Sequence, residues 1–108
     1  MAEPTTLDRL EATIAERRMA DPGSSYVARL TAKGLPKIAQ KFGEEAVETI
    51  VAALAEDRAA LVGEVADLLF HLMMLLAAKG VPLAEVLAEL DRREGTSGLA
   101  EKAARNQG

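Results

Sequence analysis

VADLLFHLMMLLAA, residues 65–78, is the stretch that decides the fold, because only Asp67 and His71 in it carry polar side chains. A helix that is apolar on nearly all sides is buried in a protein interior. The stretch is shorter than the ~20 apolar residues that a membrane-spanning helix needs, and it contains an acid. A chain of 108 residues is too small to surround such a helix completely. We therefore expect an all-α protein in which a second copy covers part of this helix, forming a homodimer.

Capping and breaking residues divide the chain around this stretch into helical segments. Thr5 and Asp8 have the spacing of a capping box, Gly34 is expected as a left-handed C-cap, and Asp57 suits an N-cap. No repeat or long linker interrupts the chain, so residues 1–108 are interpreted as one domain. The expected helices run over about 6–18, 25–34, 36–56, 58–79 and 82–93, followed by a break at 95–98 and a short basic tail at 102–105.

The composition excludes several classes of function. The net charge is −4 and the sequence pI is about 5.0, which argues against a nucleic-acid partner. The absence of cysteine excludes disulfides, zinc–thiolate sites and a thiol nucleophile. The N-terminal residues do not form an apolar secretion segment, so we expect a cytoplasmic protein.

Five acidic residues stand on the two central helical segments. Glu44, Glu45 and Glu48 lie within about one turn of each other, as do Glu64 and Asp67 on the next segment. If the two segments form an antiparallel hairpin, Glu45 faces Asp67 and Glu48 faces Glu64 at equal heights. Carboxylates that converge in this way form an all-oxygen site, which suits Mg²⁺, with Mn²⁺ as an alternative.

Two interpretations without a metal ion remain open. Acids at three- and four-residue spacing also occur on solvated helix faces, usually beside lysines. Asp67 does not fit that interpretation, because its neighbours Val65 and Leu68 are apolar. As a buried acid it could instead pair with Lys41 or Arg29.

The sequence around these acids resembles the all-α nucleoside-triphosphate pyrophosphohydrolases (the MazG-like superfamily), and within it the phosphoribosyl-ATP pyrophosphohydrolase family. The resemblance covers nearly the whole chain in order. It implies a MazG-like helical bundle of about four to five helices, completed by homodimerisation. The segments that carry it are Ser25-Tyr26, Lys33-Gly34, Lys37, KFGEEAVE at 41–48, EVADLLFHL at 64–72, GTSGL at 95–99 and KAAR at 102–105.

The resemblance also implies a reaction, a cofactor and partners. Phosphoribosyl-ATP would be hydrolysed to phosphoribosyl-AMP and pyrophosphate, the second step of histidine biosynthesis, with Mg²⁺. Glu45, Glu48, Glu64 and Asp67 would bind one or more Mg²⁺ ions, and Glu44 would accept the proton of the attacking water. The next enzyme of the pathway, a cyclohydrolase, is fused to this one in many bacteria, and we expect a stand-alone form with a functional link to it.

Basic side chains are needed to meet the phosphates of such a substrate. Lys37 and Lys41 lie two turns and one turn before Glu45, respectively, and are the first candidates. For each of these cations, a solvated surface charge is the alternative interpretation. His71 is interpreted as a hydrogen-bonded core residue, with metal ligation as the alternative. The further candidates for substrate binding are Arg29, Lys33, Lys102 and Arg105.

Three other functions are compatible with parts of this pattern. A housecleaning nucleoside-triphosphate pyrophosphohydrolase would share the metal site and differ in substrate. A redox-active di-iron bundle would need Glu-x-x-His motifs, but Leu68 stands three residues before His71. A non-enzymatic helical dimer would show no response to Mg²⁺ and leaves Asp67 unexplained.

Overall fold

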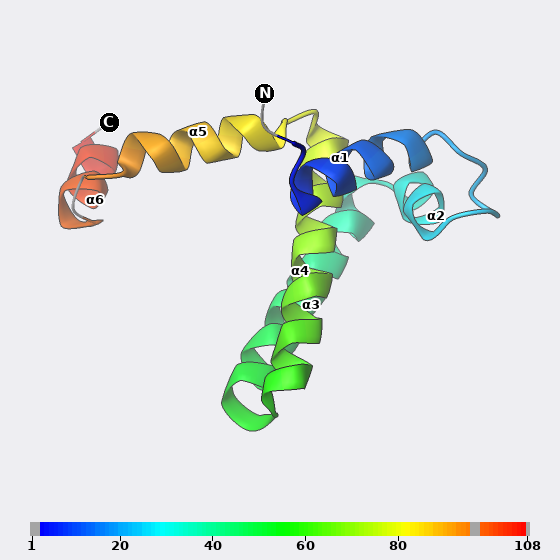
Figure 1. The fold of residues 1–108 in the computed structure, drawn as a ribbon, viewed down its shortest axis with the longest axis horizontal. Coiled ribbons are helices and arrows are strands. Elements are labelled where there is room, and N and C mark those ends of the chain that lie inside the picture. The colour runs from blue at the N-terminus through cyan, green and yellow to red at the C-terminus, as the bar shows by residue number, and fades with distance from the viewer. Residues whose placement is uncertain (1–2, 96–97, 108) are drawn as a thin grey trace.

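The computed structural model describes residues 3–95 and 98–107, and within these ranges the chain is all-α and contains no strand. The expected fold class is therefore confirmed. Helices α3 and α4 form a long hairpin, α1 and α2 pack across its open end, and α5 leads away as an arm that ends in α6 (Figure 1). The helices are α1 (Thr6–Arg17), α2 (Tyr26–Lys33), α3 (Leu35–Ala55), α4 (Arg58–Lys79), α5 (Leu83–Arg93) and α6 (Gly98–Gln107).

Local hydrogen bonds explain where α1, α2 and α4 begin. The capping box of α1 is present, with Asp8 N donating to Thr5 Oγ1 at 3.1 Å and Thr5 N donating to Asp8 Oδ2 at 2.9 Å. Ser25 Oγ accepts from Ala28 N at 3.0 Å at the start of α2. Asp57 caps α4 in the same way. These side chains satisfy backbone N–H groups that have no partner within the helix.

Two expectations about chain breaks were wrong. Gly34 has φ 96° and ψ 168°, so it is not a left-handed helical C-cap. It needs a positive φ because the chain turns there directly into α3, with Pro36 in the first turn. The basic tail at 102–105 lies within the helix α6, where we expected none. Thr96 and Ser97 of the expected break lie outside the described residues.

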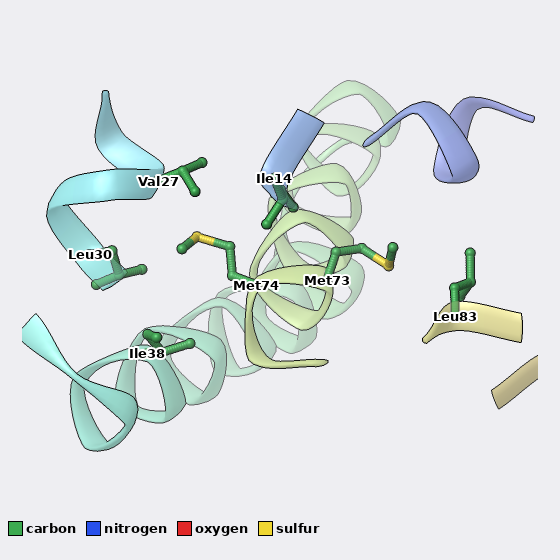
Figure 2. Packing of buried hydrophobic residues seen from close by; sticks show 7 residues of the cluster. All are labelled: Ile14, Val27, Leu30, Ile38, Met73, Met74 and Leu83. Atoms are coloured by element: carbon green, nitrogen blue, oxygen red, sulfur yellow. The ribbon is translucent and has the colours of Figure 1, made fainter. Parts of the chain in front are cut away.

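The buried core lies where the helices meet at the open end of the hairpin (Figure 2). Each of the first five helices contributes at least one side chain to it. Glu11 Oε2 also accepts a hydrogen bond from Leu83 N at 2.7 Å, which attaches the start of α5 to α1. The core side chains are Ile14, Val27, Leu30, Ile38, Met73, Met74 and Leu83.

The rest of the hairpin exposes apolar side chains in a single chain. Four of them lie on one face of α3, because their spacing of three, four and seven residues repeats with the helix. The expectation of a buried α4 therefore holds only toward its C-terminal end. The exposed residues are Val47, Ile50, Val51 and Leu54 of α3 and Val62, Val65 and Leu69 of α4.

Helix α4 is long and apolar enough to cross a membrane by length and composition alone. The whole helix has 22 residues and is long enough to span a bilayer, although residues 65–78 alone are not. The finding is weak evidence, because the core helix of a soluble protein meets the same criteria. In the single chain α4 packs against α1 and α3, and 17% of its apolar window is buried.

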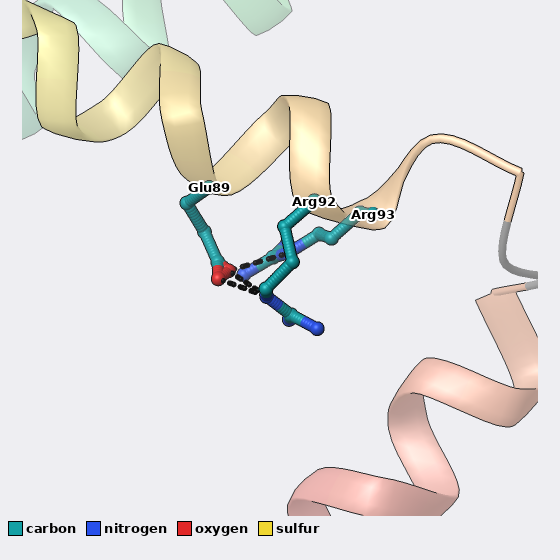
Figure 3. Close-up of polar contacts among 3 residues, drawn as sticks. All are labelled: Glu89, Arg92 and Arg93. Carbon is teal, nitrogen blue, oxygen red and sulfur yellow. Dashed lines mark hydrogen bonds and ion pairs between the residues drawn. The ribbon is translucent and has the colours of Figure 1, made fainter.

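The arm formed by α5 is stabilised within itself. Arg92 Nε lies 2.7 Å from Glu89 Oε1, and Arg93 Nε lies 3.5 Å from Glu89 Oε2 (Figure 3). The hydrogen bond from Arg92 lowers the pKa of Glu89. Leu87 and Leu90 of the same helix are exposed. The arm therefore has a charged cluster and an apolar surface, and neither lies against the hairpin.

Candidate active site

Three carboxylates converge between the helices of the hairpin. One oxygen atom from each of Glu45 and Glu48 of α3 and Glu64 of α4 lies within 4.8 Å of the other two. The chain reverses at residues 56–57, between α3 and α4, which places Glu48 and Glu64 at similar heights. We call these three residues the acidic cluster.

Two oxygen atoms of the acidic cluster are buried without a partner. Glu45 Oε2 and Glu64 Oε2 accept no hydrogen bond, and the Glu45 side chain is only 8% exposed. Burial raises the pKa of Glu45, and the hydrogen bond and charge of Glu48 raise it further. Burial, followed by the charge of Glu48, raises the pKa of Glu64. Burial and mutual repulsion therefore disfavour the ionised form of the acidic cluster.

A divalent cation with oxygen ligands fits this arrangement. Carboxylate oxygens are the ligands that Mg²⁺ and Mn²⁺ prefer, and the unpaired oxygens of Glu45 and Glu64 are available for coordination. A bound cation would remove both the repulsion between carboxylates and the cost of the two unsatisfied oxygens. The residues present therefore fit such an ion.

Asp67 lies at the edge of the acidic cluster. Its side chain is exposed in the single chain, contrary to the interpretation of a buried acid paired with Lys41 or Arg29. Its charge nevertheless contributes to the raised pKa values of Glu45 and Glu64, so its carboxylate is close to both. Asp67 is not among the three residues that converge, although it stands one turn after Glu64.

Thr49 joins the two helices at the height of the acids. Its hydroxyl donates to the carbonyl oxygen of Glu45 at 2.8 Å and lies 3.3 Å from the carbonyl oxygen of Glu64. Sequence reasoning missed this residue. A hydroxyl on an otherwise apolar face, four residues after Glu45, was the available signal.

His71 is a buried, hydrogen-bonded residue, and its interpretation as a core histidine is confirmed. Its Nδ1 lies 2.8 Å from the backbone oxygen of Asp67, which can only accept, so Nδ1 carries the proton. Nε2 is then the acceptor for the hydroxyl of Tyr26 at 2.8 Å. Both ring nitrogens are engaged, so His71 has no free atom for a metal ion. The contact with Tyr26 had not been foreseen.

The predicted cations differ in their position relative to the acidic cluster. Lys41 Nζ lies 3.9 Å from Glu44 Oε2, one turn further along α3. Lys37 is half-buried one turn earlier. Glu44 itself is exposed, one turn before Glu48. All three residues precede Glu45 on α3, on the side of the acidic cluster toward the start of that helix.

The other four predicted cations lie on other helices. Arg29 and Lys33 are exposed on α2. Lys102 and Arg105 are exposed on α6, at the outer end of the arm and away from the hairpin (Figure 1). A single chain therefore does not bring the last two to the acids.

Comparison with known proteins identifies the family. The family model described as phosphoribosyl-ATP pyrophosphohydrolase matches residues 7–94. A protein named phosphoribosyl-ATP pyrophosphatase from Rhizorhabdus wittichii is 75% identical over 103 residues, covering 95% of this chain and 97% of the relative. Its namesake from Novosphingobium aromaticivorans is 74% identical over 100 residues, covering 93% and 94%, respectively. The namesake from Erythrobacter litoralis is 71% identical over 100 residues, covering 93% and 96%. The chain therefore belongs to the phosphoribosyl-ATP pyrophosphohydrolase family.

Proposed function

We propose that this protein hydrolyses phosphoribosyl-ATP to phosphoribosyl-AMP and pyrophosphate, the second step of histidine biosynthesis. The observation that carries the proposal is the convergence of Glu45, Glu48 and Glu64 on one point of the hairpin, in a chain of this family. Relatives at 71–75% identity are named for the same activity.

We propose Mg²⁺ as the cofactor, with Mn²⁺ as the alternative. Glu45, Glu48 and Glu64 would hold the ion, and Asp67 would complete the ligand set from the edge of the cluster. When bound, the ion would neutralise charge on the phosphate oxygens and lower the pKa of a coordinated water. The two unpaired oxygens of Glu45 and Glu64 support this assignment.

Residues around the cluster would supply the remaining chemistry. Glu44 would accept the proton of the attacking water, because it is exposed beside the cluster without being part of it. Lys41 and Lys37 would bind phosphate oxygens. A Glu44→Gln variant should lose at least ~100-fold in kcat with little change in KM. A kcat within a few-fold of the wild type would remove Glu44 from this role.

We further propose a cytoplasmic homodimer. The exposed apolar faces of the α3–α4 hairpin and of α5 support it, because such faces are unfavourable in water. Arg29 and Lys33 are proposed as further substrate-binding residues, and Lys102 and Arg105 would need the partner copy or a movement of the arm to take part. The product would pass to the next-step cyclohydrolase.

The test is product analysis with purified protein. Phosphoribosyl-ATP and a panel of ordinary nucleoside triphosphates are incubated with Mg²⁺ and with EDTA. We expect pyrophosphate only with Mg²⁺, and released fastest from phosphoribosyl-ATP. Faster release from other triphosphates would support a housecleaning enzyme instead, and no Mg²⁺-dependent release would support a non-enzymatic dimer.

A further inference from the structure

A cleft of about 490 Å³ lies between the α1–α2 connection and α4, outside the acidic cluster. Its size is in the range of small-molecule binding sites, which are ~300–1,000 Å³. None of its lining residues was assigned a role in substrate binding from the sequence. The residues that line the cleft include Arg17, Ser24, Tyr26, Val27 and Phe70.

One wall of the cleft is aromatic. Tyr26 and Phe70 have ring centroids 6.2 Å apart and planes tilted by 38°. The Tyr26 side chain is 44% exposed, so its ring is accessible from the cleft. Exposed aromatic rings of this kind are surfaces on which purine bases stack.

The rim of the cleft carries a positive charge. Arg17 is exposed in the last turn of α1. In the part of the chain that the structure describes, no carboxylate lies within ion-pair distance of it. A guanidinium group without an acidic partner is suited to bind a phosphate.

The aromatic wall is held at the edge of the acidic cluster. The Tyr26 hydroxyl donates to His71 Nε2, and His71 Nδ1 donates to the backbone oxygen of Asp67, so two hydrogen bonds connect the cleft to α4 beside the acids. Burial raises the pKa of Tyr26, and the charges of Lys41 and Glu45 also act on its hydroxyl. A ligand in the cleft would therefore lie next to whatever the acidic cluster binds.

We propose that this cleft binds the purine and the phosphoribosyl group of the substrate, while the acidic cluster faces the triphosphate. The inference rests on the proposed function. Phosphoribosyl-ATP carries a second ribosyl phosphate on its purine ring, which ATP lacks. Tyr26 and Phe70 contact the purine, and Arg17 contacts the additional phosphate. Arg17 is thus a specificity-determining residue that separates this substrate from ordinary nucleoside triphosphates.

The test measures binding without turnover. The metal-free protein is titrated calorimetrically with phosphoribosyl-AMP and with AMP, which differ only in the phosphoribosyl group. We expect the wild type to bind phosphoribosyl-AMP about tenfold more tightly, the effect of one charge-assisted contact. Arg17→Met should abolish most of that difference. Arg58→Met, the same change in the first turn of α4 at the other end of the hairpin, should retain it.

Equal affinities of the wild type for the two ligands would overturn the assignment, as would an undiminished difference in Arg17→Met. The aromatic wall is tested with Tyr26→Phe, which should retain the AMP affinity, and Tyr26→Leu, which should lower it about fivefold. Equal AMP affinities in these two variants would remove the stacking role. Because no step requires hydrolysis, absence of turnover would contradict the proposed function without affecting this test.

Discussion

The hydroxyl of Tyr26 lies 2.8 Å from Nε2 of His71, 45 positions away in the sequence, and joins α2 to α4 beside the acidic cluster. The same imidazole donates through Nδ1 to the backbone oxygen of Asp67. The carbonyl of Asp67 therefore fixes the protonated nitrogen of His71, and the contact with Nε2 holds Tyr26 at the boundary between the acidic cluster and the cleft.

Replacing Tyr26 with Phe should destabilise the fold modestly. The change leaves Nε2 of the buried His71 without a donor, and water can replace the hydroxyl only in part. We expect the free energy of unfolding to fall by about 1 kcal/mol. Urea denaturation followed by circular dichroism measures this. An unchanged midpoint with an unchanged slope would mean that the hydrogen bond does not contribute to stability.

Removing one carboxylate from the acidic cluster should weaken Mg²⁺ binding. Glu64→Gln keeps the shape of the side chain and loses one charged ligand, so we expect at least a tenfold loss of Mg²⁺ affinity. The measurement is the rise in unfolding temperature as Mg²⁺ is added. Glu85→Gln, an exposed acid of α5, is the control and should respond as the wild type does. The same Mg²⁺ response in Glu64→Gln would exclude Glu64 as a ligand.

Protonation of Glu45 and Glu64 should stabilise the metal-free protein as the pH falls. The pKa values of Glu45 and Glu64 are raised above the ordinary 4.5, so the native state binds these protons more tightly than the unfolded state does. Their contribution to stability is present below pH 4.5 and is lost as the pH rises through the raised values.

The double variant Glu45→Gln/Glu64→Gln isolates this effect, because glutamine does not titrate. In EDTA at pH 7 we expect the variant to unfold at a higher urea concentration than the wild type, and the difference to shrink toward pH 5. Mg²⁺ should raise the midpoint of the wild type only. A wild type that is already more stable than the variant at pH 7 without metal would contradict the interpretation.

The exposed apolar face of α3 should be a contact between two copies of the chain. Ile50→Asp places a charge in the middle of that face and should convert a dimer into a monomer of about 11.5 kDa, as measured by light scattering. Ala12→Asp introduces the same charge at an exposed position of α1, outside the proposed contact, and should leave the dimer intact. A wild-type protein that is monomeric at micromolar concentration would exclude the dimer.

Local signals in the sequence were sufficient for most of the helices. Thr5 with Asp8, and Asp57 with Ala60, act over three residues, so their effect does not depend on the rest of the fold. The register of the α3–α4 hairpin also follows from a local feature, its turn at residues 56–57. The approach of Glu48 to Glu64 could therefore be predicted from the spacing of these two acids about the turn.

Gly34 and the basic tail show where local signals were insufficient. A glycine after a helix is compatible with several backbone conformations, and the immediate start of α3 selected an extended ψ. Thr96 and Ser97 are residue types that cap helices, but between Gly95 and Gly98 they were interpreted as a break, and the residues after them as a tail.

By itself, the sequence determined the all-α class, the extents of five helices and the acidic residues that face each other across the hairpin. Only the tertiary structure decided the contact of Tyr26 with His71, the cleft beside Arg17, the exposure of Ile50 and its neighbours, and the remote position of Lys102 and Arg105. The physical reason is the range of the interactions. Caps and turns act between residues a few positions apart, whereas these features depend on how whole helices pack against each other.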